Sequence, residues 1–472
     1  MSYLNINPIL RADSYKYSHA GQYPPGTTYV SSYTEARGVE DGRDWKEMVV
    51  FGIQPYLKFL EDNPITREDV DNARGILTAH GVPFDYDRWM YIVDKHDGKL
   101  PLNITALPEG TVIPIGMPFV QIVNTDPECA WLTNFIETQL LRATWYPVTV
   151  ATQSFHMKRA IRENMLETCD TLDKLPFMLH DFGARGVTSS EQAQIGGCAH
   201  LTSFQGTDTV EALLYAHQYY SESMSGFSIP ATEHSTMTSW TRKNEVDAFR
   251  HVIALYAKKD ALISVVSDSY DIFNVVDNIL PNDLKDELDY LRDIGATLVI
   301  RPDSGDPETV PIQVIEKLMN KFGYYTNSKG YKVLPDYLRV IQGDGIDEAT
   351  VKTILNTMKM RGLSADNIAF GSGGALLQKL NRDTLKMATK ANDACVNGEW
   401  RDVYKDPFHG GKGSKRGRQI VLRSGGSFIN KRLDEASDLE KENDLLSSVF
   451  YNGQATRHES FALIRSRIDS EL

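Results

Sequence analysis

From about residue 176 onward, hydrophobic positions gather in short runs that stop abruptly at polar or glycine residues. Helix-like stretches, such as NEVDAFRHVIALYA and DEATVKTILNTMKM, separate these runs at intervals of roughly 30 to 40 residues. The runs are FMLHDFGARG, FSIPATEHS, LISVVSDSYD, TLVIRPDSGDP, LRVIQGDG and NIAFGSGG. This alternation predicts successive strand–helix units and therefore a parallel sheet, most simply a closed α/β barrel, which we place at residues 151–384.

The flanking residues, 1–150 and 385–472, do not share this rhythm. No Pro/Gly/Ser linker parts the chain into independent domains. We therefore assign both flanks jointly to a second, mixed α/β domain. Within it, the stretch TDPECAWLTNFIETQLLRATWYP predicts a helix that Thr125 caps, with Pro127 in its first turn and Tyr146–Pro147 as its end.

Composition limits the classes of function. With 472 residues, a hydrophobic content of 41% suffices for a sizeable core, and a net charge of -13 argues against chain-wide affinity for nucleic acid or anionic membranes. The four cysteines form no C-x-x-C pair, which suggests neither a zinc cluster nor a disulfide framework. Signal-peptide and membrane-spanning patterns are both missing from the sequence. We expect a cytoplasmic protein that binds neither nucleic acid nor membrane.

Polar side chains stand where the predicted strands end, and in a barrel those ends converge on one face. The residues concerned are His180, Asp181, Arg185, His234, Asp268, Arg301, Asp303, Asp344 and the glycines of 371–374. The stretch FGSGGALLQKL precedes a helix-like run, so its glycines predict either a phosphate cradle or a tight turn. The acids of VIRPDSGDP and VIQGDG suit sugar hydroxyls or hydrated magnesium, although Asx turns would have the same pattern.

Three further segments each allow two interpretations. In HDFGARG, Phe182 and Arg185 could stack a flat ring beside an anion, or be a buried Phe and a surface Arg. The basic loop KDPFHGGKGSKRGR, residues 405–418, could close over polyphosphate or stay solvated. In PATEHSTMTSW, His234 could be a catalytic group or a core histidine with both nitrogens satisfied.

Taken in order, these segments carry a resemblance to a known family. Between residues 13 and 407 the chain resembles the nicotinamide-using type II phosphoribosyltransferases in DSYKYSHAGQYPPGT, NTDPECAWLTNFIET, HDFGARGVTSSE, GTDTV, PATEHST, SVVSDSYD, IRPDSG, YLRVIQGDG, IAFGSGGALLQKLNRD and YKDP. The resemblance implies an irregular α/β barrel that transfers phosphoribosyl from 5-phosphoribosyl 1-pyrophosphate to nicotinamide. The products would be nicotinamide mononucleotide and pyrophosphate, as in NAD salvage.

The resemblance also implies cofactors and a partner. Mg²⁺ would accompany the diphosphate, and ATP would serve as co-substrate. The family forms homodimers with two shared active sites, each completed by the partner's N-terminal segment, which is DSYKYSH in this sequence.

The family's site residues transfer position by position. Phe182 and the partner's Tyr15 would sandwich the pyridine ring, while Asp208 and Arg301 would hold its carboxamide. Breaking the bond to pyrophosphate builds positive charge on the ribose and negative charge on the leaving group, so acids and cations are both needed. The remaining implied contacts are Asp13 and Ser264 to substrate, Asp303 and Asp344 near the ribose, Gly343, Gly373 and Gly374 around the 5′-phosphate, and Arg37, Arg185, Lys405, the partner's Arg382 and the partner's Lys390 on phosphate and diphosphate.

In this family the histidine that matches His234 is phosphorylated by ATP, and hydrolysis of the phosphohistidine is coupled to product formation. A histidine can act as such a nucleophile if one ring nitrogen is held as N–H and the other is exposed. Glu233 is adjacent but points away on alternating geometry. We therefore expect Asp268, from another strand, to orient the ring, and we assign catalysis to His234, Asp268 and Asp303.

The sequence departs from the family at two places. Ala184 stands where the family often has an aromatic residue, and the basic loop is one residue shorter than in related chains. The phosphate-binding role therefore transfers better to Lys405 than to Lys412 or Lys415.

Three alternatives remain. Nicotinate phosphoribosyltransferase is the nearest, but Asp208 argues against it because an ionised carboxylate accepts a hydrogen bond from a carboxamide and repels a carboxylate. An aldolase-like sugar-phosphate barrel would need a Schiff-base lysine at a strand end, and the quoted strand ends have none. A non-enzymatic binding module that uses residues 405–418 would leave the polar strand ends unexplained.

Overall fold

The computed structural model describes residues 7–406 and 413–472, which form two compact units. Unit 1 comprises the described residues of Met1–Thr152, Gln218–Glu222 and Asn381–Glu471, and unit 2 comprises Gln153–His217, Ser223–Leu380 and Leu472. Each unit has its own hydrophobic core. Within the described part of the chain, no helix combines the length and apolar character that a membrane span needs.

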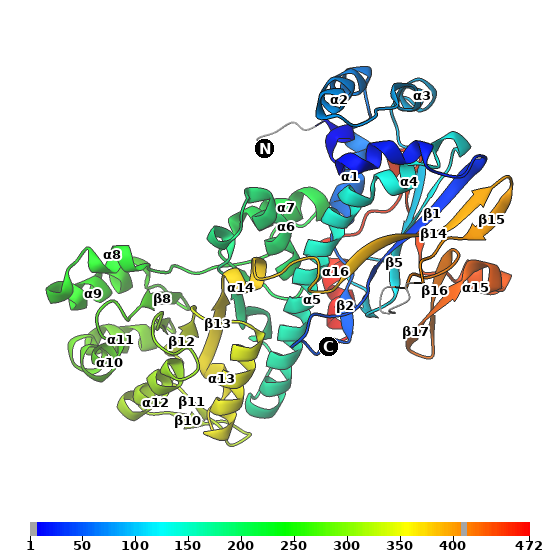
Figure 1. The fold of residues 1–472 in the computed structure, drawn as a ribbon. Coiled ribbons are helices and arrows are strands. Elements are labelled where there is room, and N and C mark those ends of the chain that lie inside the picture. The colour runs from blue at the N-terminus through cyan, green and yellow to red at the C-terminus, as the bar shows by residue number, and fades with distance from the viewer. Residues whose placement is uncertain (1–6, 407–412) are drawn as a thin grey trace. The chain divides into compact units, whose positions relative to one another are not determined.

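Unit 2 is built on a six-stranded parallel sheet (Figure 1). The strand order is β7-β6-β13-β12-β9-β8. The strands are β6 (Leu179–Asp181), β7 (Gly206–Thr207), β8 (Leu262–Val266), β9 (Thr297–Arg301), β12 (Leu338–Gln342) and β13 (Ile368–Ser372). Beside the sheet lies the hairpin of β10 (Tyr325–Thr326) and β11 (Lys332–Val333).

The two edges of this sheet are joined by an extended segment, residues 227–232. Phe227 forms a parallel bridge to Gly206 of β7, and Ala231 forms a parallel bridge to Ser264 of β8. The sheet is therefore an irregular α/β barrel, which confirms the fold class predicted from the sequence.

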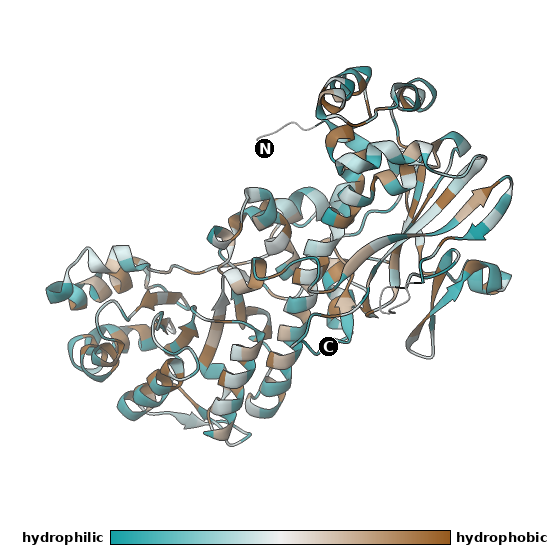
Figure 2. Cartoon of the chain, in the orientation of Figure 1, coloured by the Kyte–Doolittle hydropathy of each residue, from teal (hydrophilic) through white to brown (hydrophobic). Residues whose placement is uncertain are grey.

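Helices surround the barrel and bury one face each. In α13 the buried residues Val351, Ile354, Leu355 and Met358 have the spacing of a single helical stripe, and Figure 2 shows hydrophobic and hydrophilic positions mixed along such helices. The helices of this unit are α6 (Ser190–His200), α7 (Val210–Tyr220), α8 (His234–Thr238), α9 (Glu245–Tyr256), α10 (Ile272–Asn274), a π-helix (Val275–Asp283), α11 (Lys285–Asp293), α12 (Val310–Phe322), α13 (Glu348–Met360) and α14 (Gly374–Leu377). The two helices predicted between strands, α9 and α13, are confirmed.

Five of the six predicted strand runs form strands, and FSIPATEHS is the exception. This run makes only the two isolated bridges of 227–232. Pro230 lies between them and has no backbone N–H to donate to a ladder. The two-residue strand β7 was not predicted, because it is too short for a hydrophobic pattern.

Unit 1 contains a seven-stranded sheet with the order β15-β14-β1-β5-β3-β18-β19, in which neighbouring strands are antiparallel. Its centre pairs β1, from the N-terminal part, with β14, from the C-terminal part. The predicted second domain, built jointly from both ends of the chain, is therefore confirmed. The strands of this unit are β1 (Thr27–Ala36), β2 (Glu47–Val49), β3 (Leu102–Ala106), β4 (Val112–Pro114), β5 (Pro118–Asn124), β14 (Met387–Val396), β15 (Glu399–Asp402), β16 (Gln419–Ser424), β17 (Ser427–Arg432), β18 (Ser447–Tyr451) and β19 (Gln454–Ala455).

The helices of unit 1 are α1 (Gln54–Asp62), α2 (Arg67–His80), α3 (Tyr86–His96), α4 (Leu132–Phe135), the first part of α5 (Glu137–Thr168), α15 (Asp438–Glu442) and α16 (Phe461–Asp469). Helices α1 to α4 and the start of α5 contribute buried residues to the core of unit 1, whereas α15 buries none.

The helix predicted to end at Tyr146–Pro147 is wrong in its bounds. Asp126, not Thr125, caps a short 3-10 turn (Pro127–Cys129), and α5 runs through Pro147. Proline in a helix interior removes a hydrogen bond and usually ends the helix. Here the proline ring packs against Gly52, where a Cβ would lie 2.4 Å from Pro147 Cγ. Tertiary packing therefore holds the helix across the proline.

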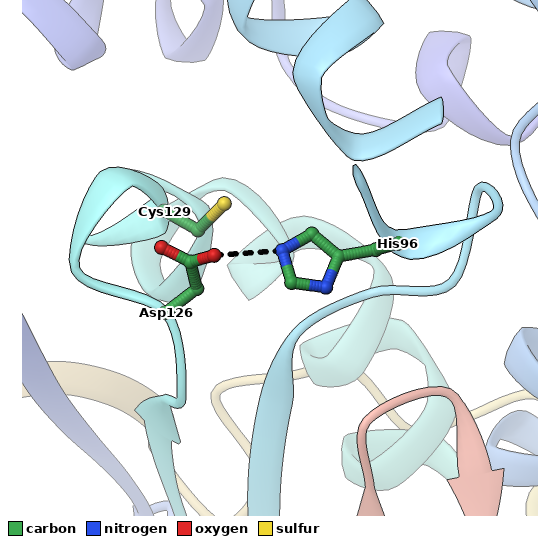
Figure 3. Close-up of side chains that lie close together, drawn as sticks. All are labelled: His96, Asp126 and Cys129. Carbon is green, nitrogen blue, oxygen red and sulfur yellow. Dashed lines mark hydrogen bonds and ion pairs between the residues drawn. The ribbon is translucent and has the colours of Figure 1, made fainter. Parts of the chain in front are cut away.

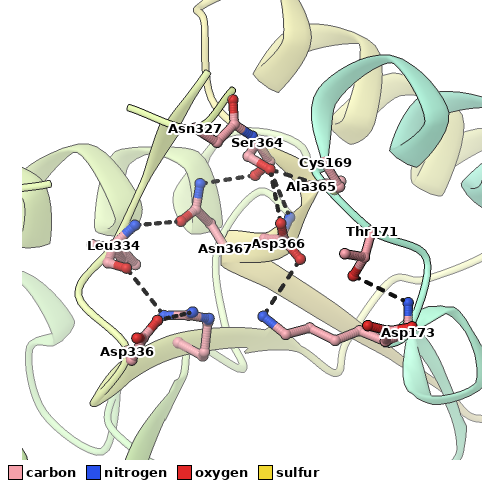
Figure 4. Close-up of polar contacts among 12 residues, drawn as sticks. Cys169, Thr171, Asp173, Asn327, Leu334, Asp336, Ser364, Ala365, Asp366 and Asn367 are labelled. Atoms are coloured by element: carbon pink, nitrogen blue, oxygen red, sulfur yellow. Dashed lines mark hydrogen bonds and ion pairs between the residues drawn. The ribbon is translucent and has the colours of Figure 1, made fainter. Parts of the chain in front are cut away.

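The loops before β12 and β13 are fastened by a buried polar network (Figure 4). Asn367 Oδ1 accepts a hydrogen bond from the Leu334 N–H at 2.7 Å, and its Nδ2 donates to the Lys332 and Ser364 carbonyls at 2.9 and 2.8 Å. Asn327 Nδ2 donates to the Thr168 carbonyl at 2.8 Å. Every one of these groups is paired, so this end of the barrel is built for stability.

We expect Asn367→Ala to lower the free energy of unfolding by about 1 to 3 kcal/mol, because it leaves the buried Leu334 N–H without a partner, whereas the Lys332 and Ser364 carbonyls keep their backbone hydrogen bonds. Urea denaturation of the purified variant measures this loss. The exposed Asn278→Ala is the matched control and should change stability by less than about 0.5 kcal/mol. Equal effects of the two substitutions would contradict the role given to the network.

Candidate active site

The carboxyl ends of the barrel strands carry the polar residues that the sequence singled out. Because the strands are parallel, these ends lie at one rim. Phe182 follows β6, Asp208 follows β7, Asp268 follows β8 and Asp344 follows β12. The rim also receives Arg185, His234, Arg301, Asp303, Gly343, Gly373 and Gly374.

The ring of Phe182 lies across the ends of two neighbouring strands. A Cβ added to Gly371 would come within 2.0 Å of Phe182 Cε2, and one added to Gly343 within 3.4 Å. The Phe182 N–H donates to the Ser372 carbonyl at 2.9 Å, which fixes the start of the loop. Glycine at 371 is therefore required to make room for the ring, and the half-buried ring offers a flat apolar surface at the rim.

The glycines beyond the ring form the start of a helix. Gly373 precedes α14, and the N–H groups of Gly373 and Gly374 make no hydrogen bond within the described residues. A Cβ added to Gly186 would lie 3.4 Å from Gly374 Cα, so the loop that carries the exposed Arg185 lies beside them. N–H groups at a helix start that make no hydrogen bond to a described residue favour the phosphate-cradle interpretation over a simple tight turn.

His234 opens α8 and is held by a carboxylate from the neighbouring strand. Its Nε2 lies 2.9 Å from Asp268 Oδ1, and its Nδ1 lies 3.9 Å from Asp303 Oδ2. The parallel bridge between Ala231 and Ser264 brings the two chain segments into this register. The His234 side chain is 47% exposed, which excludes the interpretation as a satisfied core histidine. Glu233 caps the helix instead of contacting the ring.

Asp268 is the centre of a hydrogen-bond relay. Its Oδ2 accepts from the Asp303 N–H at 3.1 Å and from the Ser304 hydroxyl. Burial acts to raise the pKa of Asp268, but the hydrogen bonds from Ser304, His234 and the Asp303 N–H outweigh it and lower the pKa. The carboxylate is therefore ionised at neutral pH and can hold a proton on His234 Nε2.

Arg301 presents an unused donor. Its side chain is 15% exposed, and its Nε is buried without a hydrogen-bond partner among the described residues. Asp303 Oδ1 lies 3.8 Å away, too far for a hydrogen bond. A buried N–H without an acceptor is costly, so this group is a candidate for binding a ligand oxygen.

Asp208 presents an unused acceptor. Its backbone N–H donates to the Asp181 carbonyl at 2.9 Å, and its Oδ1 accepts from the Ser228 hydroxyl at 2.6 Å. The other carboxylate oxygen has no partner in the described chain. Ser264 differs from the other predicted contacts, because it is buried within β8 and its backbone pairs with residues 230 and 232.

Two residues that the structure brings to the site were not predicted. Ser228 orients Asp208, and Ser304 supports Asp268. Both lie inside segments that the sequence analysis singled out: Ser228 belongs to FSIPATEHS, and Ser304 belongs to IRPDSG. The sequence does not distinguish these serines as functional, because a serine near a strand end usually forms a local turn.

The other predicted residues lie in unit 1, where the cations form one group. Lys390, on β14, faces Tyr33 of β1. Burial lowers the pKa of Lys390, and the nearby charges of Arg37, Lys16 and Lys405 lower it further. Such a cluster of positive charge suits a polyanion.

Three predicted residues of unit 1 lie outside this group of cations: Asp13, Tyr15 and Arg382. Asp13 accepts a hydrogen bond from Thr138 at 2.7 Å, and Arg382 pairs with Asp383 at 3.1 Å. Tyr15 is 55% exposed, and its ring contacts His19 edge-on at 4.9 Å between ring centroids.

The basic loop is only partly described. Lys412 and its neighbours in 407–412 lie outside the described residues. Lys415 pairs with Glu35 at 2.7 Å, and Arg418 lies 3.3 Å from Asp393. These two cations are therefore neutralised within the unit, unlike Lys405.

Comparison with known proteins gives two family matches. The nicotinate phosphoribosyltransferase (NAPRTase) family matches residues 177–454, and the nicotinamide phosphoribosyltransferase N-terminal domain matches residues 7–104. The chain is 46% identical to a nicotinamide phosphoribosyltransferase of Xanthomonas campestris pv. campestris, over 100% of this chain and 99% of that protein. It is 33% identical to one of Acinetobacter baylyi, over 99% and 98%.

Solved structures share the fold. A nicotinate-nucleotide pyrophosphorylase from Pyrococcus furiosus superposes with a TM-score of 0.63 at 16% identity, covering 100% of this chain and 98% of that one. Human nicotinic acid phosphoribosyltransferase gives a TM-score of 0.60 at 16% identity, covering 97% and 93%. At this level of identity the likeness extends to the fold alone.

We expect Gly371→Ala to destabilise the protein by about 1 to 3 kcal/mol, because the added methyl group overpacks the space that the Phe182 ring fills. Thermal unfolding measures the change. Gly374→Ala is the control, since a Cβ there meets nothing within 4 Å. A Gly371 variant as stable as the control would show that the ring does not need the glycine.

Asp181 gives a prediction for pH. It is buried, its Oδ1 accepts from the Gly183 N–H at 2.7 Å, and burial raises its pKa to about 6. Because the folded protein keeps a proton that the unfolded chain has already lost, stability should fall by up to about 3 kcal/mol as the pH rises from about 4 to about 6. Asp181→Asn should lack this component, which denaturation across that pH range would reveal as a flatter profile.

Proposed function

The chain belongs to the nicotinamide phosphoribosyltransferase family, and on this premise we propose that it transfers phosphoribosyl from 5-phosphoribosyl 1-pyrophosphate to nicotinamide. The proposal depends on two polar groups at the barrel rim that have no hydrogen-bond partner among the described residues. One is the buried Arg301 Nε–H, a donor, and the other is an Asp208 carboxylate oxygen, an acceptor. A carboxamide supplies one acceptor and one donor, so it satisfies both. A nicotinate carboxylate would satisfy Arg301 but be repelled by Asp208.

The reaction needs positioning and electrostatics more than proton transfer. The pyridine nitrogen attacks C1 of the ribose with its own lone pair, the C1–O bond breaks, and pyrophosphate leaves with the bonding electrons. Asp303 and Asp344 are the carboxylates proposed to stabilise the positive ribose, and Phe182 provides the surface on which the ring stacks. Nicotinamide mononucleotide and pyrophosphate are the products.

The phosphate and diphosphate groups need cations and N–H donors. We assign the 5′-phosphate to the free N–H groups of Gly373 and Gly374 with Gly343 beside them. As the family resemblance implies, the cations proposed for phosphate and diphosphate are Arg37, Arg185, Lys405, the partner's Arg382 and the partner's Lys390. The strand-end carboxylates, Asp303 and Asp344, are oxygen donors of the kind that would hold a Mg²⁺ ion bound to the diphosphate.

The homodimer of the family extends to this chain as a proposal. Large apolar side chains are exposed on α7 and the segment after it, with Val210 at 66%, Leu214 at 65% and Phe227 at 50%. The exposed Tyr15, at 55%, is the residue proposed to complete the nicotinamide sandwich of a second copy. Association of two chains would cover these surfaces.

All four cysteines are free thiols, in keeping with a reducing, cytoplasmic setting.

ATP coupling is proposed to proceed through His234. With its Nε2 proton held by Asp268, the ring offers the Nδ1 lone pair, which has no hydrogen bond to a described residue. Nδ1 would attack the γ-phosphorus of ATP, the bond to the bridging oxygen would break, and ADP would leave. Water then hydrolyses the phosphohistidine. Localised negative charge on Asp268 favours this tautomer.

The decisive experiment supplies 5-phosphoribosyl 1-pyrophosphate and Mg²⁺ with either nicotinamide or nicotinate, and follows mononucleotide formation with and without ATP. We expect turnover of nicotinamide, a rise with ATP, and little turnover of nicotinate. Preference for nicotinate would reject the assignment of Asp208. Absence of turnover with both would leave a sugar-phosphate barrel of another class.

Asp208→Asn should reduce kcat/KM for nicotinamide by roughly 10-fold to 100-fold, the cost of one hydrogen bond to a charged group. The same change removes the repulsion of a carboxylate, so the ratio of nicotinate to nicotinamide turnover should rise. Parallel assays of both substrates measure the ratio. A ratio equal to that of the unaltered enzyme would show that Asp208 does not select the substrate.

Asp268→Asn should abolish the acceleration by ATP, with a loss of about 100-fold or more in ATP hydrolysis, because the amide no longer holds His234 in the required tautomer. The matched control is the exposed Asp283→Asn, which should respond to ATP normally. Incorporation of the γ-phosphate of labelled ATP into protein is measured directly. Normal labelling of the Asp268 variant would contradict the orienting role.

A further inference from the structure

A second cluster of reactive side chains lies in unit 1, remote in sequence from the barrel residues. His96 is the last residue of α3, and Asp126 and Cys129 belong to the short turn after β5. One ligand atom from each lies within 4.8 Å of the other two. Figure 3 shows the three side chains converging on one space.

The local structure places these atoms before any ligand arrives. Asp126 caps the 3-10 turn through its Oδ1, which accepts from the Glu128 N–H at 2.9 Å, and its carbonyl accepts from the Cys129 N–H at 3.0 Å. This turn holds the carboxylate and the thiol on one side. Asp126 Oδ2 accepts from His96 Nε2 at 2.8 Å and from the Tyr91 hydroxyl at 3.0 Å.

The hydrogen bonds of the cluster do not involve the sulfur, which lies in the hydrophobic core of unit 1. A hydrogen-bonded strap between α3 and the turn needs only His96 and Asp126. Cys129 is 1% exposed and has no hydrogen-bond partner among the described residues. Burial, followed by the charges of Asp126 and Glu128, raises the pKa of Cys129 to about 12, so the thiol is neutral without a ligand.

We propose that His96, Asp126 and Cys129 bind a divalent transition-metal ion, for which Zn²⁺ has the best-matched ligand preferences. Imidazole nitrogen, carboxylate oxygen and thiolate sulfur are the three donor types that zinc takes in proteins, whereas magnesium and calcium avoid sulfur and nitrogen. Two anionic ligands balance the charge of the ion. Three protein ligands leave a fourth position for water.

The geometry requires small movements only. Zinc bond lengths of about 2.0 to 2.3 Å place tetrahedral ligand atoms roughly 3.3 to 3.7 Å apart. The His96–Asp126 pair would open slightly from 2.8 Å, and the sulfur would approach by rotation about its side-chain bond. The side chains of His96 and Asp126 are 23% and 16% exposed, so an ion and its water can reach the site.

Binding exchanges a proton for the metal. The Cys129 thiol loses its proton to solvent as the sulfur–metal bond forms. His96 gives up its hydrogen bond to Asp126 and moves its proton from Nε2 to Nδ1, so that the Nε2 lone pair can bind the ion. Affinity should therefore rise with pH. Because only the folded turn brings the three ligands together, the ion stabilises the end of α3 against the turn by mass action.

Cobalt titration of the chelator-treated, full-length protein tests the site, because a thiolate bound to Co²⁺ gives a charge-transfer absorption in the near ultraviolet. We expect this band at one equivalent, together with visible bands of a tetrahedral ion, and loss of both when Zn²⁺ is added. Cys129→Ser should lack the charge-transfer band. His96→Gln, at a partly exposed position that tolerates change, should bind about tenfold or more weakly.

The matched control is Cys395→Ser, which alters another buried cysteine of unit 1 and should keep the band. Zn²⁺ should raise the melting temperature of the unaltered protein and of the Cys395 variant, but not of the His96 and Cys129 variants. If the unaltered protein gives no band, or if Cys129→Ser retains it, the cluster is only a hydrogen-bonded strap. Neither result depends on phosphoribosyl transfer.

Discussion

The parallel pairing that joins the two edges of the barrel is the constraint on which the candidate active site depends. Ala231 pairs with Ser264, so the chain leaves this bridge with His234 and Asp268 a few residues further on, side by side. Without the bridge, Pro230 and its neighbours would form an ordinary loop, and the histidine would have no carboxylate to hold its ring. The same bridge therefore closes the barrel and brings His234 next to Asp268.

The two ends of the barrel treat polar groups in opposite ways. At the amino ends of the strands, Asn367 and its neighbours pair every buried donor and acceptor. At the carboxyl ends, the buried Arg301 Nε has no hydrogen-bond partner among the described residues, and the exposed Asp208 carboxylate keeps one oxygen open to a ligand. Unpaired buried groups cost stability and persist where a ligand completes them. The satisfied end supplies the rigidity that lets the other end hold its groups ready.

Unit 1 shows the same principle on an antiparallel sheet. The pairing of β1 with β14 brings cations from the two ends of the chain together, so that burial and mutual repulsion lower the pKa of Lys390. A polyanion relieves that repulsion. The turn after β5 likewise gathers His96, Asp126 and Cys129, whose buried sulfur makes no hydrogen bond to any described residue. The repulsion among the cations is the basis for proposing a polyanion, and the grouping of nitrogen, oxygen and sulfur atoms is the basis for proposing a metal ion.

Hydrophobic periodicity by itself determined the barrel class, the helices α9 and α13, and the rim on which the polar residues stand, because strand and helix patterns are local. The motifs added the family and named Phe182, Asp208 and His234. Tertiary structure alone decided that α5 continues through Pro147 and that FSIPATEHS closes the sheet without becoming a strand. It alone revealed Ser228, Ser304 and the grouping of His96 with Cys129, because these depend on contacts between residues far apart in sequence, which no local pattern records.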